Sequence, residues 1–213
     1  MTLHNAIKER ILVLDGAMGT RAASAVETDK LVYALFDADG KLIENTGMVV
    51  KENAFANGSE NVSMSLVKGQ TYTITFWAQN SACPAYTITA EQDGLKVSVD
   101  YTGANNDETR DAFFASETFT VSDQNEIEVF LKRPFAQINV GVYQEDWDAA
   151  VASGIEIANS VAYIKNAATS INLLNGMVGE ETTDVPVEYT AAAIPTESLM
   201  VDVDKDGTKE AYK

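Results

Sequence analysis

The residues with the clearest potential for chemistry form the stretch Asp202-Val-Asp-Lys-Asp-Gly207. Carboxylates at the first, third and fifth positions, followed by a glycine, match the first half of a calcium-binding loop, in which oxygen ligands surround a cation. The twelfth position of such a loop should be a bidentate glutamate, but here it is Lys213. We therefore favour a solvated hairpin turn at this stretch and predict no metal and no cofactor.

Nucleophilic catalysis lacks the residues that it needs. The chain has one histidine, His4, and one cysteine, Cys83. Because His4 lies in the N-terminal segment, no Ser-His-Asp arrangement can be built inside the main domain, and no disulfide can form within the chain. A carboxylate pair of the glycosidase kind stays open, since spacing in a β fold does not report proximity. We predict that the protein is not an enzyme.

The net charge and hydropathy of the chain argue against two further classes of function, nucleic-acid binding and membrane spanning. The chain has 15 Lys+Arg against 32 Asp+Glu, a formal net charge of -17, which argues against a nucleic-acid partner. The adjacent Lys132 and Arg133 could hold an anion, but we favour their pairing with the nearby Glu126 or Glu128. No apolar run approaches the roughly 20 residues that cross a bilayer.

The elements that must position these residues are nearly all strands. Apolar and polar residues alternate in Thr71–Ala78, which places Tyr72, Ile74, Phe76 and Ala78 toward the core and leaves Trp77 to cover an edge. A second alternating strand, 31–36, has Leu31, Tyr33 and Leu35 on one face. Short strands at 8–12-residue spacing with turns between them are typical of a β-sandwich.

One longer stretch, Phe130–Val142, is expected to link two sheets. Its second half alternates, with Ala136, Ile138, Val140 and Val142 on one face. Pro134 interrupts it, and because proline lacks a backbone N–H it cannot lie in the middle of a paired ladder. We predict a strand, a corner at Pro134 and a second strand.

The sequence pattern changes after Val142. Residues 144–153 are predicted to be a short helix that ends at Gly154, and four more strands follow. We expect an all-β chain with three parts: a leader or fusion-like segment at 1–20, an N-terminal sandwich at 21–142 and an incomplete second β domain at 143–213.

The N-terminal segment has a local resemblance of its own. Glu9–Thr20 reads ERILVLDGAMGT, which resembles the opening of the homocysteine-binding barrel of cobalamin-dependent methionine synthase. The likeness stops at Arg21, and that family binds zinc through cysteines that this chain lacks. We interpret 1–20 as a fused or mis-joined leader, and a methionine synthase fragment ranks third among the candidate functions.

A wider resemblance covers residues from about 31 to 213. The matching pieces are Lys68–Gln79, Val99–Gly103, Arg110–Phe113, Leu131–Asn139 and Asn172–Gly176. They resemble the fimbrillin-like surface lipoproteins of Bacteroidales, which are related to fimbrial subunits. The resemblance implies tandem transthyretin-like sandwiches of Greek-key topology. It also implies export to the outer-membrane surface, with anchoring through a lipid signal absent from this sequence.

The function implied by this family is structural or adhesive. In fimbrial subunits an arginine-specific protease removes an N-terminal strand, and a strand from the next subunit fills the groove by β-strand addition. Arg21 has small neighbours and is the candidate processing site here, although an ordinary linker arginine is the simpler interpretation. The partners expected are other fimbrial subunits, or a host or glycan ligand. The alternative function is a monomeric carbohydrate- or protein-binding module at the cell surface.

Overall fold

The computed structural model describes residues 6–14, 28–56, 58–105, 107–122, 126–135, 142–155, 160–189, 200–203 and 206–212. The described chain is all-β with a single short α-helix, as predicted, and it also has one 3₁₀ turn, Glu108–Arg110. It divides into two compact units. Unit 1 comprises Met1–Gly103, Asp107–Phe135 and Ala168–Thr183, and unit 2 holds the remaining residues.

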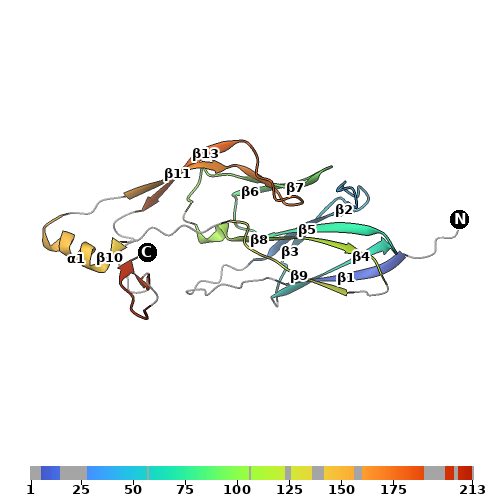
Figure 1. Cartoon of the computed structure of the whole chain (residues 1–213), viewed down its shortest axis with the longest axis horizontal. Helices are drawn as coiled ribbons and strands as arrows, with labels where there is room; N and C mark the ends of the chain where they lie inside the picture. The colour runs from blue at the N-terminus through green and yellow to red at the C-terminus, as the bar shows by residue number, and fades with distance from the viewer. Residues whose placement is uncertain are drawn as a thin grey trace. The chain divides into compact units, whose positions relative to one another are not determined.

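Unit 1 is built from three sheets in its described residues (Figure 1). The central sheet has the order β3 (Met48–Glu52), β2 (Lys30–Asp37), β5 (Thr71–Gln79) and β8 (Ala112–Thr120), and every neighbouring pair is antiparallel. A second sheet has the order β4 (Ser59–Val67), β1 (Ala6–Leu14) and β9 (Glu126–Phe130). The third has the order β12 (Ser170–Asn172), β7 (Gly94–Val99) and β6 (Tyr86–Glu91).

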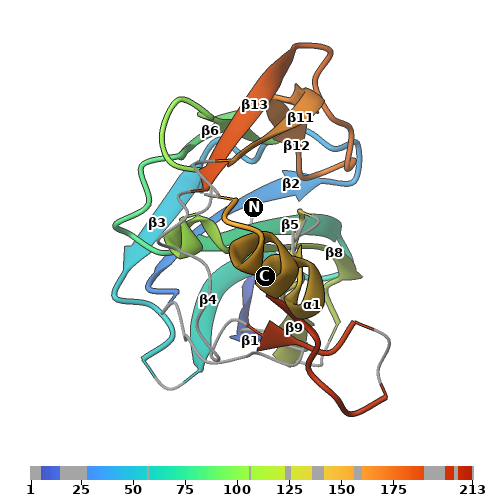
Figure 2. The same cartoon turned by 90° about the vertical axis from the view of Figure 1, so that its left-hand side faces the viewer.

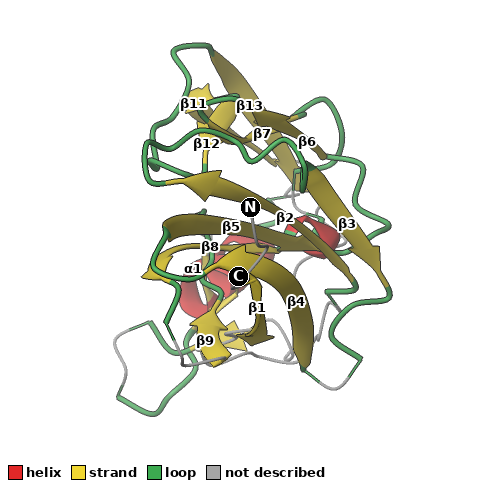
Figure 3. Ribbon diagram, turned by 90° about the vertical axis from the view of Figure 1, so that its right-hand side faces the viewer, coloured by secondary structure: helices red, strands yellow, loops and turns green. Residues whose placement is uncertain are grey.

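The central sheet is covered on both faces, so that unit 1 has three layers (Figure 3). The first core lies between the central sheet and β4-β1-β9, and it includes Leu31, Leu35, Ile74, Phe76 and Ala78. These are residues that the alternation placed inward, and that prediction is confirmed. Ile127 packs against this core, and Val129 and Leu131 belong to it.

The second core lies between the central sheet and β12-β7-β6, and here the sequence interpretation was wrong. Trp77 is fully buried and packs with Val32, Phe36 and Leu95 instead of covering an edge. Its indole N–H donates to Gln79 Oε1 at 2.9 Å, and the Tyr86 ring meets it edge-on with centroids 5.1 Å apart. A strand with both faces buried needs such a partner for every polar atom that it takes inside.

The N-terminal segment also differs from the expectation. Ala6–Leu14, interpreted as part of an appended leader, forms β1 in the middle of a sheet of unit 1. It pairs antiparallel with β4 from Ala6 opposite Val67 to Leu14 opposite Ser59. A strand hydrogen-bonded on both sides is an integral part of its sheet, because its backbone groups satisfy those of two neighbours.

The stretch around Pro134 is described in part. β9 ends at Phe130, and Lys132 forms an antiparallel bridge with Phe114 near the start of β8. The chain therefore passes from the second sheet to the edge of the central one just before Pro134, as a strand that links two sheets should. Residues 136–141, with Ile138 and Val140, lie outside the described residues.

Unit 2 contains the helix that the sequence predicted. α1 (Gln144–Ala152), which faces the viewer in Figure 2, follows β10 (Val142–Tyr143), and Gly154 ends the helix with φ +74°. Its strands are β11 (Ser160–Ala168), β13 (Thr182–Tyr189), β14 (Met200–Val201) and β15 (Ala211–Tyr212), paired as β11-β13 and β10-β15-β14. Within the described part of the chain, no helix has the length and apolarity to cross a membrane.

The segment Ala168–Thr183 returns to unit 1, although it follows β11 in the chain. Its strand β12 pairs antiparallel with β7, and the N–H of Leu173 donates to Leu95 O at 2.9 Å. Leu173 is buried in the second core. A turn lies at Asn175-Gly176, where Gly176 has φ +72° and its N–H donates to Asn172 O. This part of the expected second domain therefore completes the first.

Candidate functional site

The strand β1 occupies the position of greatest functional interest. It separates β4 from β9: it is antiparallel to β4 and parallel to β9, from Arg10 opposite Glu126 to Leu14 opposite Phe130. In the described residues β4 and β9 have no other strand partner within their sheet. Without β1, both strands would present free N–H and C=O groups to a gap one strand wide. Such a gap can accept an extended segment through backbone hydrogen bonds.

The candidate processing residue Arg21 lies outside the described residues. The described chain leaves β1 at Leu14 and resumes at Thr28, two residues before β2 begins at Lys30. Arg21 therefore falls, in sequence, between the strand that fills the gap and the central sheet. Its cleavage stays a prediction.

The acidic stretch near the C-terminus brings together carboxylates that the sequence only partly indicated. Carboxylate oxygens of Asp202, Asp206 and Glu210 all lie within 4.8 Å of one another. Asp204, the expected ligand at the third position, lies outside the described residues, and Glu210 takes a place that the sequence interpretation missed. Three oxygen ligands of this kind could hold a hard cation such as Ca²⁺.

The hydrogen bonds of these carboxylates nevertheless fit the turn that we favoured. Asp202 Oδ2 accepts from the N–H of Gly207 at 2.9 Å, and Asp206 Oδ1 accepts from the N–H of Thr208 at 2.7 Å. Glu210 Oε1 accepts from the N–H of Val203 at 2.5 Å. Acidic side chains that accept backbone N–H groups two to seven residues away stabilise turns without any ion.

Arg133 has a different ion-pair partner from those predicted. It forms a two-pronged ion pair with Asp111, with Nε–Oδ1 at 2.7 Å and Nη2–Oδ2 at 2.6 Å, where Glu126 or Glu128 was expected. Its guanidinium also lies 5.0 Å from the centroid of the Phe113 ring. Since Asp111 already neutralises it in a bidentate geometry, Arg133 is poorly suited to hold a free anion.

Cys83 is the free thiol of the described chain and is buried in a loop, as a small apolar residue would be. Its backbone carbonyl accepts from Gln79 Nε2 at 3.3 Å. Gln79 thereby links this loop to the indole of Trp77. These two contacts of Gln79 tie the loop to Trp77 of the second core, which is a structural role.

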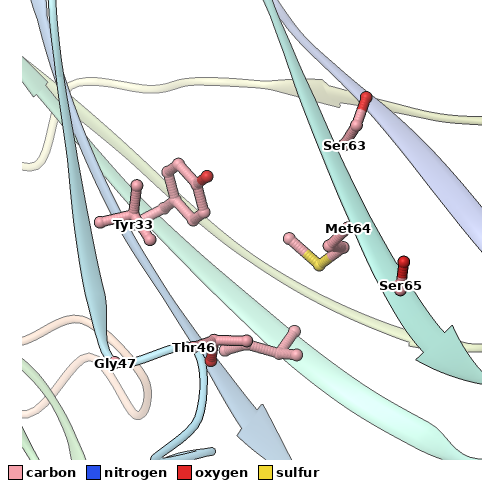
Figure 4. Close-up of a pocket in the computed structure, with 8 residues that line it drawn as sticks. Tyr33, Thr46, Gly47, Ser63, Met64 and Ser65 are labelled. Atoms are coloured by element: carbon pink, nitrogen blue, oxygen red, sulfur yellow. The ribbon is translucent and has the colours of Figure 1, made fainter.

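A pocket of about 260 Å³ opens where the edges of β3 and β4 face each other. Its walls are mainly apolar, from Leu35, Val49 and Met64. Figure 4 shows the Tyr33 ring and the Met64 thioether pointing toward one another across it, while the Ser63 and Ser65 side chains point away. The pocket is thus an opening of the first core at the margin of the two sheets.

An ion pair joins the same two strands beside this pocket. Lys51 of β3 donates to the Glu60 carboxylate and to Asn61 O of β4. Burial alone would raise the pKa of Glu60, but the Lys51 hydrogen bond and charge, with backbone hydrogen bonds at Phe55 and Asn61, lower that pKa below its ordinary value. Burial, and then the Glu60 charge, raise the pKa of Tyr33.

The sequence of this chain matches the model of one protein family. Residues 5–209 match a family described as a family of unknown function, DUF6562. The match begins within the segment 1–20 that we interpreted as a leader, and it extends almost to the end of the chain. None of the curated proteins matches this chain in sequence.

Several solved structures are similar to this one at low sequence identity. A candidate adhesin from Bacteroides ovatus has a TM-score of 0.50 and 14% identity, over 87% of this chain and 62% of that one. A candidate polysaccharide-binding protein from Bacteroides thetaiotaomicron has a TM-score of 0.49 and 14% identity, over 96% and 70%. The fimbrial anchor protein Mfa2 from Porphyromonas gingivalis has a TM-score of 0.49 and 14% identity, over 84% and 66%.

These similarities bear on the fold. The adhesin candidate shares the all-β architecture, which agrees with the fold class that the fimbrillin-like resemblance implied. The resemblance to methionine synthase gains no support from any of these structures. The present chain spans about two thirds of the length of the three structures that it resembles.

Proposed function

We propose, from the premise that this chain belongs to the family of unknown function DUF6562, that it is a non-enzymatic structural or adhesive protein of the cell surface. The proposal extends to a role as a fimbrial subunit that works by β-strand addition. It rests on the sequence resemblance of residues from about 31 onward to fimbrillin-like proteins and on one structural observation, the placement of β1.

The placement of β1 is the observation that carries the proposal. A single N-terminal strand lies between β4 and β9 and runs parallel to β9, and it precedes a candidate cleavage site in the sequence. Its nine residues pair along the whole of β4. An incoming strand of similar length could therefore replace it with little change in the number of backbone hydrogen bonds, while alternate side chains set the register.

Cleavage after Arg21 would convert this arrangement into an assembly site. The cut would leave β1 held only by non-covalent contacts. The linker would no longer keep β1 at a high effective concentration beside its own sheet, so β1 could dissociate. A strand from another subunit would then compete for the gap between β4 and β9. The backbone would supply affinity, and the apolar first core would favour a strand with alternating apolar residues.

The experiment is limited digestion with an arginine-specific protease, followed by sedimentation analysis over a range of concentrations. We expect cleavage after Arg21, and oligomers that increase with concentration. The matched control is Arg21→Gln, which should stay uncut at this position and monomeric under the same treatment. A cleaved product that is monomeric at every concentration would exclude strand exchange and leave the monomeric surface-binding module as the function.

The structural half of the proposal can be tested separately. A chain that begins at residue 22 lacks β1 and should lose stability or associate, because β4 and β9 then carry unpaired edges. Addition of a synthetic peptide with the sequence Ala6–Leu14 should restore the thermal midpoint. An unchanged midpoint in the shortened chain, without the peptide, would show that β1 contributes nothing to the sheet.

A further inference from the structure

In the described part of the chain, the outer edge of β3 is open to further strand pairing. β3 lies at the end of the central sheet and pairs only with β2 among the described residues. Natural proteins usually block such edges with charged side chains, prolines or bulges. The exposed apolar residues of β3 are instead Met48 at its start, 39% exposed, and Val50 at its centre, 44% exposed.

The charge within β3 is directed away from this edge. Lys51, which could act as a blocking residue, donates to Glu60 and to Asn61 O on β4. Glu52 stands at the end of the strand, where Lys30 pairs with it at 3.4 Å. The span from Met48 to Val50 is therefore free of charge along its length.

Met48 and Val50 lie on the face of the central sheet that contributes to the second core, but that core does not cover them. Met48 lies opposite Ala34 and Val50 opposite Val32 on β2, and both of these β2 residues are fully buried in the second core. The layer β12-β7-β6 covers β2 and β5, since its strands supply Leu95 and Val97 to that core, but it leaves Met48 and Val50 exposed. The apolar face of the central sheet thus continues past its cover to the edge.

We propose that this edge pairs antiparallel with the β3 edge of a second copy of this chain. The sequence of β3 is self-complementary in one register. When Val49 lies opposite Val49 of the second copy, each Met48 lies opposite a Val50, and each Lys51 lies opposite a Gly47. Apolar side chains then meet apolar side chains on both faces, and no like charges oppose each other.

The neighbouring register, which is centred on Val50 instead of Val49, is less favourable. With Val50 opposite itself, each Met48 would lie opposite a Glu52, which would bury a carboxylate beside an apolar side chain or break its pairing with Lys30. The two-fold pairing centred on Val49 therefore has the better chemistry. It joins the two central sheets into one continuous sheet, and Val49 of each copy lies beside the pocket that it already lines.

The contact is independent of strand addition at β1, because it uses a different sheet. Two paired strands of five residues make an interface smaller than the roughly 1,200 Å² of stable complexes, so the association is weak and transient. Each copy has a formal charge of -17. Salt screens this repulsion, and we expect the dimer to strengthen as ionic strength rises, opposite to a contact built on ion pairs.

The decisive experiment uses register-specific disulfides in the full-length chain with Cys83 replaced by alanine. In the proposed register Val49→Cys places two thiols directly opposite, about 4.5–5.5 Å apart at Cβ, whereas Met48→Cys places them on a diagonal of about 7–8 Å. Oxidation with diamide should link Val49→Cys into dimers at least about tenfold more than Met48→Cys. Equal linking by the two variants, or none by Val49→Cys, would overturn the register.

Sedimentation of the unlinked protein tests the edge itself. Val50→Lys should weaken self-association at least about tenfold, because it places a charge in the middle of the paired edge. The control is Val161→Lys, which changes a residue of similar exposure, 42%, on β11 and should leave the association unchanged. A wild-type chain that is monomeric up to about 1 mM in high salt, or equal weakening by both variants, would contradict the proposal.

Discussion

The two faces of the central sheet of unit 1 are both covered, but in different ways. The first core is closed by β4, β1 and β9, and its members on β2 and β5 follow a simple alternation. The second core is closed by β6 and β7 and by Leu173, which arrives from a distant part of the sequence. This contrast shows that alternation of apolar and polar residues predicts burial of one face of a strand. Burial of both faces is indicated instead by a continuous run of apolar residues.

The strongest test of this comparison replaces one large residue on each face of β5. Trp77→Ala in the second core should cost about 3–5 kcal/mol of unfolding free energy, as should Phe76→Ala in the first, because each leaves a large cavity in a fully buried site. Urea unfolding followed by far-ultraviolet circular dichroism gives both values. A control, Phe130→Ala at a residue 56% exposed, should cost about 0.5 kcal/mol or less.

If Trp77→Ala kept its stability while Phe76→Ala lost much of it, the result would support the edge position that we first predicted for Trp77. It would also remove the case for a second core, since Trp77 is its largest member.

The next test concerns the distant cover of the second core. Leu173→Ala should cost about 2–5 kcal/mol, because Leu173 is 1% exposed and packs in that core. Met177→Ala in the same hairpin, at a residue 67% exposed, is the matched control and should be nearly neutral. The readout is the urea midpoint of each variant. Equal small effects would show that Ala168–Thr183 does not dock on unit 1.

A smaller effect is expected where this hairpin meets the turn before β7. A Cβ added at Gly94 would lie 2.2 Å from Asn172 Oδ1, so Gly94→Ala must displace the Asn172 side chain. That side chain donates to Asp93 O at 3.1 Å and accepts from the N–H of Leu174 at 3.0 Å. Loss of these bonds should cost about 1–3 kcal/mol.

The double variant Gly94→Ala/Asn172→Ala separates this contact from a general effect of the glycine. Because the two substitutions disrupt the same interaction, their combined cost should fall short of the sum of the single costs. Additive costs, measured by the same urea transitions, would place the two residues in independent contacts.

The smallest effect belongs to the ion pair at the margin of the first core. Lys51 lowers the pKa of Glu60, so the carboxylate stabilises the fold above the unfolded-state pKa, and this contribution is lost as the pH falls through the folded-state pKa. Glu60→Gln should cost about 0.2–1 kcal/mol at pH 7 and progressively less in acid. Thermal midpoints between pH 7 and pH 3 measure it. A constant difference across that range would exclude the pair as its cause.

The sequence could predict the strands and one core because local alternation reports which side of a strand is buried. Leu31, Leu35, Ile74 and Phe76 followed from that pattern alone. The second core was available in principle from the run Leu31–Phe36, in which nearly every residue is apolar, as in strands buried on both faces. Leu173 carried no such signal, because its partner Leu95 is fixed only by the long-range pairing of β12 with β7.

The candidate site shows the same limit. Asp202 and Asp206 were recognisable by their spacing, but Glu210 joins them through the return of the chain at β15. Arg133 was expected to pair with a carboxylate near it in sequence, whereas its partner Asp111 lies at the start of the neighbouring β8. Residue type indicated that charges would be neutralised, and the sheet topology decided by which partner.

The return of Ala168–Thr183 to unit 1 has a consequence for the order in which the chain can fold. Because the chain is synthesised from its N-terminus, β6 and β7 can pair long before Ser170–Asn172 is available to pair with β7. During that interval the β7 edge is open and the second core lacks Leu173. Closing this contact joins residues more than seventy positions apart, a slow step with a high entropic cost of loop closure. The exposed β7 edge is therefore a second place, beside β3, at which an unfinished chain offers unpaired backbone groups to another strand.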